Sequence, residues 1–183
     1  MIIIVEGMDG TGKTTLVQQL AHRLGVQPSK FVGSLGPSDD YRLVLVDRTI
    51  SEIHELEIAS AEGRAIKRLY DRFPLISEAV YGPVLRGRNC FGGLYYPLRS
   101  RLLALKTVII YCRPDRDVIQ ANVQQAPQMS GVLEHFSKLL DAYDKLFVEL
   151  TYSPVNSYIT VFDYTRDEVR ELVYKIRRFY NYG

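Results

Sequence analysis

The chain has 183 residues, of which 46% are hydrophobic and 24% charged, so it is long enough for one packed domain and too apolar to be disordered. A net charge of +2 gives no whole-chain reason to expect a nucleic acid or membrane partner. Two cysteines exclude a disulfide framework, and no apolar stretch reaches membrane length. We therefore expect a reduced, cytoplasmic protein without a membrane partner.

Short apolar runs alternate with amphipathic stretches along the sequence. Residues 2–5 are Ile-Ile-Ile-Val, which predicts a strand buried on both faces, and a helix follows that ends near Gly25. We expect further strands at 30–35, 66–70, 108–111 and 159–162. We expect further helices at about 40–60, at 130–150, and after a capping box at 165–168. This alternation predicts an α/β fold with a parallel sheet flanked by helices on both faces.

Residues 7–14 fit the pattern G-x-x-x-x-G-K-[ST] between the first strand and the first helix. Glycines let successive backbone N–H groups face phosphate oxygens, and the helix N-terminus adds its positive dipole end. Lys13 brings a charge to the β- and γ-phosphates, and the Thr14 hydroxyl is a ligand for Mg²⁺. The sequence thus predicts a site for ATP with Mg²⁺ formed by Asp9, Gly10, Thr11, Gly12, Lys13, Thr14 and Thr15.

A missing motif and the length of the chain together indicate which class of P-loop protein the sequence fits. A switch GTPase needs a guanine-reading N-K-x-D segment, which the sequence lacks, and ATPase motors normally need a longer chain. A small kinase fits 183 residues.

The segment from Glu6 to Thr15 resembles the opening E-G-x-D-G-x-G-K-T-T of thymidylate kinases. Asp71-Arg72-Phe73, followed by Ser77 and Tyr81, is similar to their D-R-[YFH] segment. Val44–Arg48 is similar to their F-x-x-x-R helix, and Phe136 and Tyr143 match a late helix of the family. The resemblance implies a three-layer P-loop kinase fold over residues 1–183, with lid-like or substrate-covering segments at about 82–106 and 114–131.

The same resemblance implies roles for the matching residues. Asp71 would hold Mg²⁺ through water or orient the acceptor, and Arg72 would bind the acceptor phosphate with its forked guanidinium. Arg48 would bind the base. The implied substrate-binding residues are Arg48, Arg72, Phe73, Ser77, Tyr81 and Tyr143. For Asp71-Arg72 the alternative is a surface ion pair, and for Arg48 and Tyr143 a solvated arginine and a core tyrosine.

The sequence departs from the family where transfer needs positive charge. Thymidylate kinases carry an arginine inside the P-loop or in the lid, whereas neither this loop nor residues 117–129 contain a basic residue other than Lys13, and Asn122 stands near the lid position. Residues 33–38 also lack the arginine that follows the family's second strand. We expect the missing charge to come from Arg86, Arg88, Arg113 or Arg116, with the lid reduced.

The sequence therefore predicts a phosphotransferase that uses ATP and Mg²⁺ to phosphorylate a deoxynucleoside monophosphate, most simply dTMP. A deoxynucleoside, or a modified pyrimidine within DNA bound by the basic segment 82–106, are alternative acceptors. A nucleotide-binding module without turnover would also explain the empty lid. The resemblance further implies a possible homodimer, and the compact chain suits a bacterial or viral origin.

Overall fold

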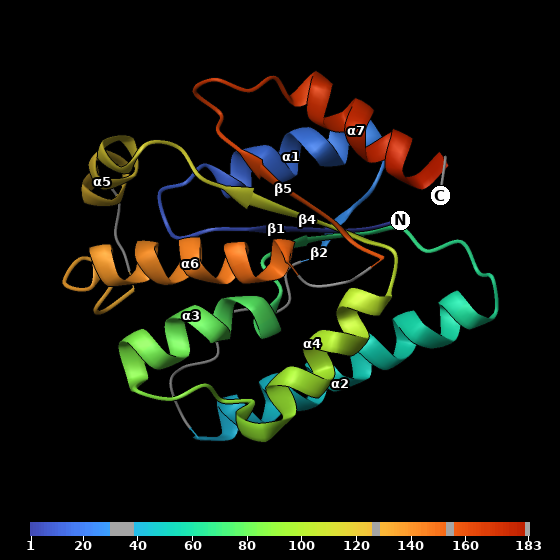
Figure 1. Ribbon diagram of the computed structural model, residues 1–183, viewed down its shortest axis with the longest axis horizontal. Coiled ribbons are helices and arrows are strands. Elements are labelled where there is room, and N and C mark those ends of the chain that lie inside the picture. Colours follow the sequence, from blue (N-terminus) through green and yellow to red (C-terminus); the bar gives the residue numbers. More distant parts are fainter. Residues whose placement is uncertain (30–38, 126–128, 153–155, 182–183) are drawn as a thin grey trace.

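The structure is a computed structural model that describes residues 1–29, 39–125, 129–152 and 156–181. Its centre is a five-stranded parallel sheet with the strand order β2-β3-β1-β4-β5 (Figure 1). The strands are β1 (Ile2–Glu6), β2 (Pro28–Ser29), β3 (Arg68–Asp71), β4 (Thr107–Cys112) and β5 (Tyr158–Phe162). All the strand pairs are parallel, so the carboxyl ends of the strands meet at one edge.

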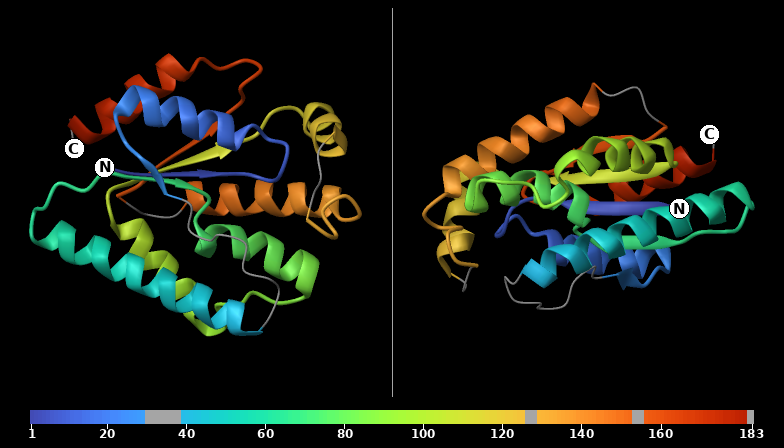
Figure 2. Two further views of the ribbon diagram at one scale, coloured as in Figure 1. Left: turned by 180° about the vertical axis from the view of Figure 1, so that it is seen from behind. Right: turned by 90° about the horizontal axis from the view of Figure 1, so that it is seen from below.

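Helices cover both faces of this sheet, which confirms the predicted α/β fold (Figure 2). One face carries α1 (Lys13–Leu24) and α7 (Val169–Asn181). The other face carries α2 (Asp39–Ala61), α3 (Pro74–Arg86), α4 (Tyr95–Ala104) and α6 (Phe136–Thr151). Helix α5 (Arg116–Gln125) lies beyond the carboxyl end of β4, next to the loop that joins β1 to α1.

The central position of β1 in the sheet explains why residues 2–5 are all apolar. Ile3 and Val5 pack in the core beneath α1 and α7, whereas Ile2 and Ile4 pack in the larger core on the opposite face. Because successive side chains of a strand point to opposite faces, a central strand of a three-layer fold buries every residue. All five β1 residues are buried.

The strand expected at 30–35 lies outside the described residues. Within them, the strand that pairs with β3 on this side of the sheet is Pro28–Ser29. Another sequence prediction needs correction. The capping box expected at 165–168 does not start the last helix, because the Thr165 hydroxyl donates to Asp163 and α7 begins at Val169.

The segment 82–106, expected to cover the substrate, is largely helical. Helix α3 continues through Pro83 to Arg86, and α4 buries Leu98 and Leu102 in the core. Sequence periodicity missed α4 because it is short and contains Pro97, which the first turn of a helix tolerates since its N–H groups have no intrahelical partner.

Within the described residues, none of the helices combines the length and apolar character that a bilayer crossing requires.

Candidate active site

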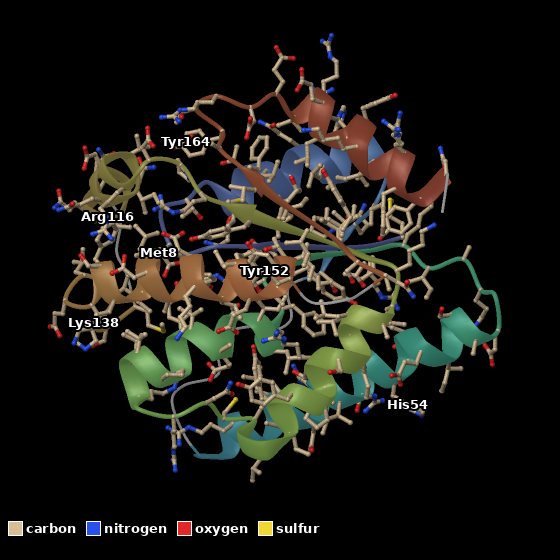
Figure 3. All side chains as sticks on the ribbon, viewed as in Figure 1. Met8, His54, Arg116, Lys138, Tyr152 and Tyr164 are labelled. Carbon is tan, nitrogen blue, oxygen red and sulfur yellow. The ribbon has the colours of Figure 1, made fainter. Side chains whose placement is uncertain are left out.

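Polar side chains gather at the edge of the sheet where β1, β3 and β4 end. The register aligns Val5 with Asp71 and Glu6 with Tyr111, so the ends of three neighbouring strands lie at the same level. Figure 3 shows Met8, Arg116 and Tyr164 at this same end of the molecule. Ligands of open parallel sheets bind at such carboxyl edges.

The phosphate loop leaves β1 with two glycines that the fold requires. Gly10 has φ 78°, and a Cβ there would lie 2.6 Å from Cγ2 of Val123 on α5. Gly12 has φ 80°, and a Cβ there would lie 2.8 Å from the Tyr164 ring. The left-handed backbone and the close contacts both exclude larger side chains at these two positions. The contacts also show that helix α5 and the β5–α7 connection pack directly against this loop.

Lys13 lies beneath the loop and is 7% exposed. Its Nζ donates to the carbonyl oxygen of Met8 at 2.5 Å, and the Thr11 hydroxyl donates to the same oxygen at 2.8 Å. Burial and then the charge of Arg72 lower the pKa of Lys13 to about 8. A partly dehydrated ammonium with a single carbonyl partner is well suited to exchange that partner for a phosphate oxygen.

Thr14 and Asp71 form the predicted metal pair, with the Thr14 hydroxyl donating to Oδ2 of Asp71 at 3.2 Å. In the part of the chain that the structure describes, no three His, Cys, Asp or Glu side chains are grouped to hold a metal ion alone. Mg²⁺ usually takes only one or two protein oxygens and completes its shell with water and substrate phosphates. The two oxygen ligands present therefore fit Mg²⁺ bound together with a nucleotide.

Arg72 connects the phosphate loop to helix α3. Its Nη2 donates to Asp9 Oδ1 at 2.6 Å and to the Tyr81 hydroxyl at 3.0 Å, and Tyr81 donates to Asp9 Oδ2 at 3.1 Å. The guanidinium also lies 4.9 Å from the Tyr81 ring centroid. Burial alone would raise the pKa of Asp9, but the charges of Arg72 and Lys13 lower it overall. The two side chains thus form a charged pair beside the phosphate loop.

The backbone of Arg72 is left-handed, with φ 70°, which is strained for a residue with a side chain. Its N–H donates to the Val5 carbonyl at 3.0 Å, and the next N–H, of Phe73, donates to Glu6 Oε1 at 2.7 Å. These two bonds fix the turn on both sides of Arg72. The sequence gives no sign of this constraint, because it depends on contacts between β1 and the end of β3.

Glu6 is fully buried and holds three elements together. Besides the Phe73 N–H, its carboxylate lies 3.0 and 3.1 Å from the Ser77 hydroxyl of α3 and accepts a 3.3 Å hydrogen bond from Tyr143 of α6. Burial raises the pKa of Glu6, although the Phe73 N–H and the charge of Arg72 partly oppose this. Ser77 and Tyr143, expected to contact substrate, are therefore bonded to Glu6.

The side chains of the remaining predicted site residues, Phe73, Arg48 and Thr15, lie outside the hydrogen-bond network of Arg72 and Glu6. Phe73 is fully buried, with its ring edge-on to Tyr70 at 5.1 Å, and Arg48 lies on an exposed part of α2. Thr15 is exposed in the first turn of α1. The substrate contacts expected of Phe73 and Arg48 stay predictions.

The four candidate arginines differ in how firmly they are held. Arg86 pairs with the buried Glu78 of its own helix, and Arg88 is exposed just after that helix. Arg113 donates two hydrogen bonds to Asp144, at 2.8 and 3.0 Å.

Arg116 is the candidate with the most exposed partner. It is the first residue of α5, and its Nη2 donates to Asp141 Oδ1 at 2.6 Å. The side chains of Arg116 and Asp141 are 44% and 67% exposed. An ion pair this exposed is weak, so the Arg116 guanidinium can be redirected at low cost.

Asn122 and Tyr164, to which the sequence analysis gave no role, contact the outer side of the phosphate loop. Asn122 Nδ2 donates to the Gly10 carbonyl at 2.9 Å and to the Tyr164 hydroxyl at 2.9 Å. Asn122 therefore links α5, the phosphate loop and the β5–α7 connection. The sequence offered one signal, since Asn122 stands near the position of a lid arginine.

No protein-family model matches the chain, and no curated protein matches it. Solved structures do match. The YorR protein from Bacillus subtilis in complex with phosphorylated GDP is 15% identical, with 97% of this chain and 96% of that chain covered and a TM-score of 0.68. Deoxyadenosine kinase from M. mycoides is 16% identical, with TM-scores of 0.58 with bound dCTP and 0.56 with bound dATP. These two matches cover 97% of this chain and 99% and 100% of the others. The chain therefore has the three-layer fold of P-loop kinases.

Proposed function

We propose that the protein is an ATP-dependent kinase that transfers the γ-phosphate to a pyrimidine deoxynucleoside monophosphate such as dTMP. One observation carries the proposal: Asp9, inside the phosphate loop, is bonded directly to Arg72, at the end of the neighbouring strand. A loop that binds a triphosphate and a guanidinium that binds an acceptor phosphate thus adjoin, as direct transfer requires.

On the donor side, the loop amides and Lys13 bind the triphosphate, and Thr14 and Asp71 hold Mg²⁺. When bound, Mg²⁺ neutralises charge on the phosphate oxygens. On the acceptor side, Arg72 orients the monophosphate so that one of its oxygens attacks the γ-phosphorus. The bond to the β-phosphate oxygen breaks, and ADP leaves with that electron pair.

Arg116 is the best candidate for the charge that neutralises the transferring group. It begins α5, the helix that packs on Gly10, and its ion pair with Asp141 is exposed. Arg113 is held by two partly buried hydrogen bonds to Asp144 and Arg86 by a buried glutamate. The two hydrogen bonds of Arg116, to Ser137 and Asp141, are both exposed. We expect Arg116→Ala to lower kcat about a hundredfold, the typical effect of removing one charge-stabilising donor, with Arg86→Ala as the matched control that retains kcat.

A deoxynucleoside is the second candidate acceptor, favoured by the 2.6 Å contact of Arg72 with Asp9. A guanidinium already neutralised by a carboxylate attracts an acceptor phosphate less strongly, and the Asp9 carboxylate could instead accept a hydroxyl proton. The likeness to a deoxyadenosine kinase supports this candidate at the level of fold.

The test is a panel of acceptors incubated with ATP and Mg²⁺ and analysed by mass spectrometry. It contains dTMP, dCMP, their nucleosides, deoxyadenosine and DNA with modified pyrimidines. We expect a diphosphate product from dTMP. A monophosphate product from a nucleoside alone would favour the second candidate, and no phosphorylated product from any acceptor would favour a nucleotide-binding module without turnover.

A further inference from the structure

A groove of about 960 Å³ lies between α1 and α7, the two helices that cover the opposite face of the sheet from α3 and α6 (Figure 1). It is separate from the phosphate loop, since its first residue on α1 is Gln18, more than one helical turn after Lys13. The proposed transfer uses none of the groove residues.

The groove is lined by positive charge. Arg23 of α1 and Arg170 and Arg177 of α7 contribute three guanidinium groups, and His22 adds an imidazole. None of the described residues lining it is acidic. Arg177 is fixed in place by a 3.1 Å hydrogen bond from Nη2 to the Arg23 carbonyl, which leaves its other N–H groups available to a ligand.

An aromatic ring stands among these charges. Tyr174 lines the groove and is 66% exposed, so its ring is open to a ligand from solvent. Arg170, Tyr174 and Arg177 are spaced i, i+4 and i+7, so they form one stripe of α7 facing α1. Proteins bind nucleotides without base-specific hydrogen bonds by combining two kinds of side chain. Guanidinium groups bind the phosphates, and an aromatic ring between them stacks on a base.

We propose that this groove is a second nucleotide-binding site, in which Arg23, Arg170 and Arg177 bind phosphates and Tyr174 stacks on a base. The ligand is either a free nucleotide or a nucleotide within a single strand, because both present the same phosphate and base chemistry. The site does not depend on the proposed kinase activity and is accessible when the phosphate loop is disabled.

The same helix offers a matched control. Lys175 and Arg178 carry two positive charges on α7, both are exposed, and neither lines the groove. Replacing this pair changes the net charge of the protein as much as replacing Arg170 and Arg177. A difference between the two double variants therefore reports the groove and not the overall charge.

The experiment measures binding in the Lys13→Ala background, so that the phosphate loop does not contribute. The probes are fluorescein-labelled oligothymidylate, followed by anisotropy at several salt concentrations, and dATP, followed by calorimetry. We expect at least one probe to bind, Arg170→Ala with Arg177→Ala to weaken that binding at least about tenfold, and Lys175→Ala with Arg178→Ala to weaken it less than about threefold. Tyr174→Ala should weaken binding, whereas Tyr174→Phe should retain it because the ring is kept.

The pattern of outcomes is decisive. If the oligonucleotide binds more tightly than dATP, and the salt dependence of its binding falls by about two counterions in the groove variant, the ligand is a single strand. If dATP binds more tightly, the ligand is a free nucleotide. Binding of neither probe, or equal loss in the two double variants, would overturn the proposal. Thermal unfolding of each variant shows whether it is folded. Intact kinase activity of Arg170→Ala with Arg177→Ala in an otherwise wild-type chain, where Lys13 is present, separates this site from the proposed active site.

Discussion

The two halves of the candidate active site are built in different ways. The donor half is a continuous segment, residues 7–14, which relies on backbone N–H groups and on three glycines with positive φ. The acceptor half is assembled from side chains of β1, β3, α3 and α6, centred on Arg72 and Glu6. The donor half therefore depends on local conformation, and the acceptor half depends on the packing of distant elements.

This difference predicts how each half responds to substitution. Changes in the donor half should affect chemistry and nucleotide binding with little effect on stability. Changes in the acceptor half should affect stability and acceptor binding together, because the groups that orient Arg72 also join the elements.

The largest effect is expected for Lys13→Met. It removes the charge that the proposed function assigns to the β- and γ-phosphates, so transfer should fall by about a thousandfold. It also removes a buried ammonium, so the free energy of unfolding at pH 7 should not fall by more than about 1 kcal/mol. Steady-state kinetics and thermal unfolding of the same variant test both statements, and a large loss of stability would contradict the contrast between the halves.

The next effect is expected for Glu6→Ala, which leaves the Phe73 N–H and the Tyr143 hydroxyl without their buried acceptor. The expected loss is about 3 kcal/mol of unfolding free energy, measured by urea denaturation. Glu6→Gln keeps a carbonyl oxygen and should lose much less.

The Glu6→Gln variant also has a pH signature. Burial raises the pKa of Glu6 in the folded protein, so above its unfolded pKa the folded state binds more protons. The contribution of Glu6 to stability therefore falls as pH rises above about 4.5. The stability difference between wild type and Glu6→Gln should change in this direction, and a constant difference between pH 4 and 7 would contradict a raised pKa.

Arg72→Ala should raise KM for the acceptor by about tenfold to a hundredfold, the effect of losing charged hydrogen bonds to a phosphate.

The same Arg72→Ala variant should also affect the donor half, because the charge of Arg72 lowers the pKa of Lys13. In wild type, ATP affinity should fall as pH rises through about 8, where Lys13 loses its proton. In Arg72→Ala this midpoint should move to higher pH, and calorimetric titration with ATP from pH 6.5 to 9.5 measures the shift. If the pH midpoint of ATP affinity were the same in Arg72→Ala as in wild type, the charge of Arg72 would not influence Lys13, and the expected coupling between the two halves would be contradicted.

The smallest effect is expected for Asn122→Ala, which removes the hydrogen bonds to Gly10 and Tyr164. These bonds are partly exposed, so ATP affinity should change by about tenfold at most. Tyr164→Phe provides the control, since it removes one of the two bonds and keeps the ring on Gly12. A loss as large as that of Lys13→Met would mean that the donor half also depends on distant contacts.

The loop between β1 and α1 could be located from the sequence because its determinants are local. The apolar run of β1, the spacing of Gly7, Gly12 and Lys13, and the left-handed glycine that ends α1 lie within 25 residues. The order of strands and helices also followed from periodicity. The fold could therefore be predicted in outline, whereas helix α4 and the start of α7 could not.

The acceptor half was less predictable because its key contacts are long-range. Glu6 bonds to partners 67, 71 and 137 positions away. A sequence resemblance singles out Glu6, Ser77 and Tyr143 one by one, but it does not reveal that they contact one another. The left-handed backbone of Arg72 is equally invisible, since arginine has no preference for that conformation.

The most direct test of whether the two halves form one active site is calorimetric binding of a bisubstrate analogue, in which adenosine and thymidine are joined through a chain of phosphates. The analogue should bind more tightly than ATP or dTMP alone, and Lys13→Ala and Arg72→Ala should each weaken its binding by at least about tenfold. Binding no tighter than that of ATP, unaffected by Arg72→Ala, would show that Arg72 does not face the transferred phosphate and would contradict the proposed kinase site.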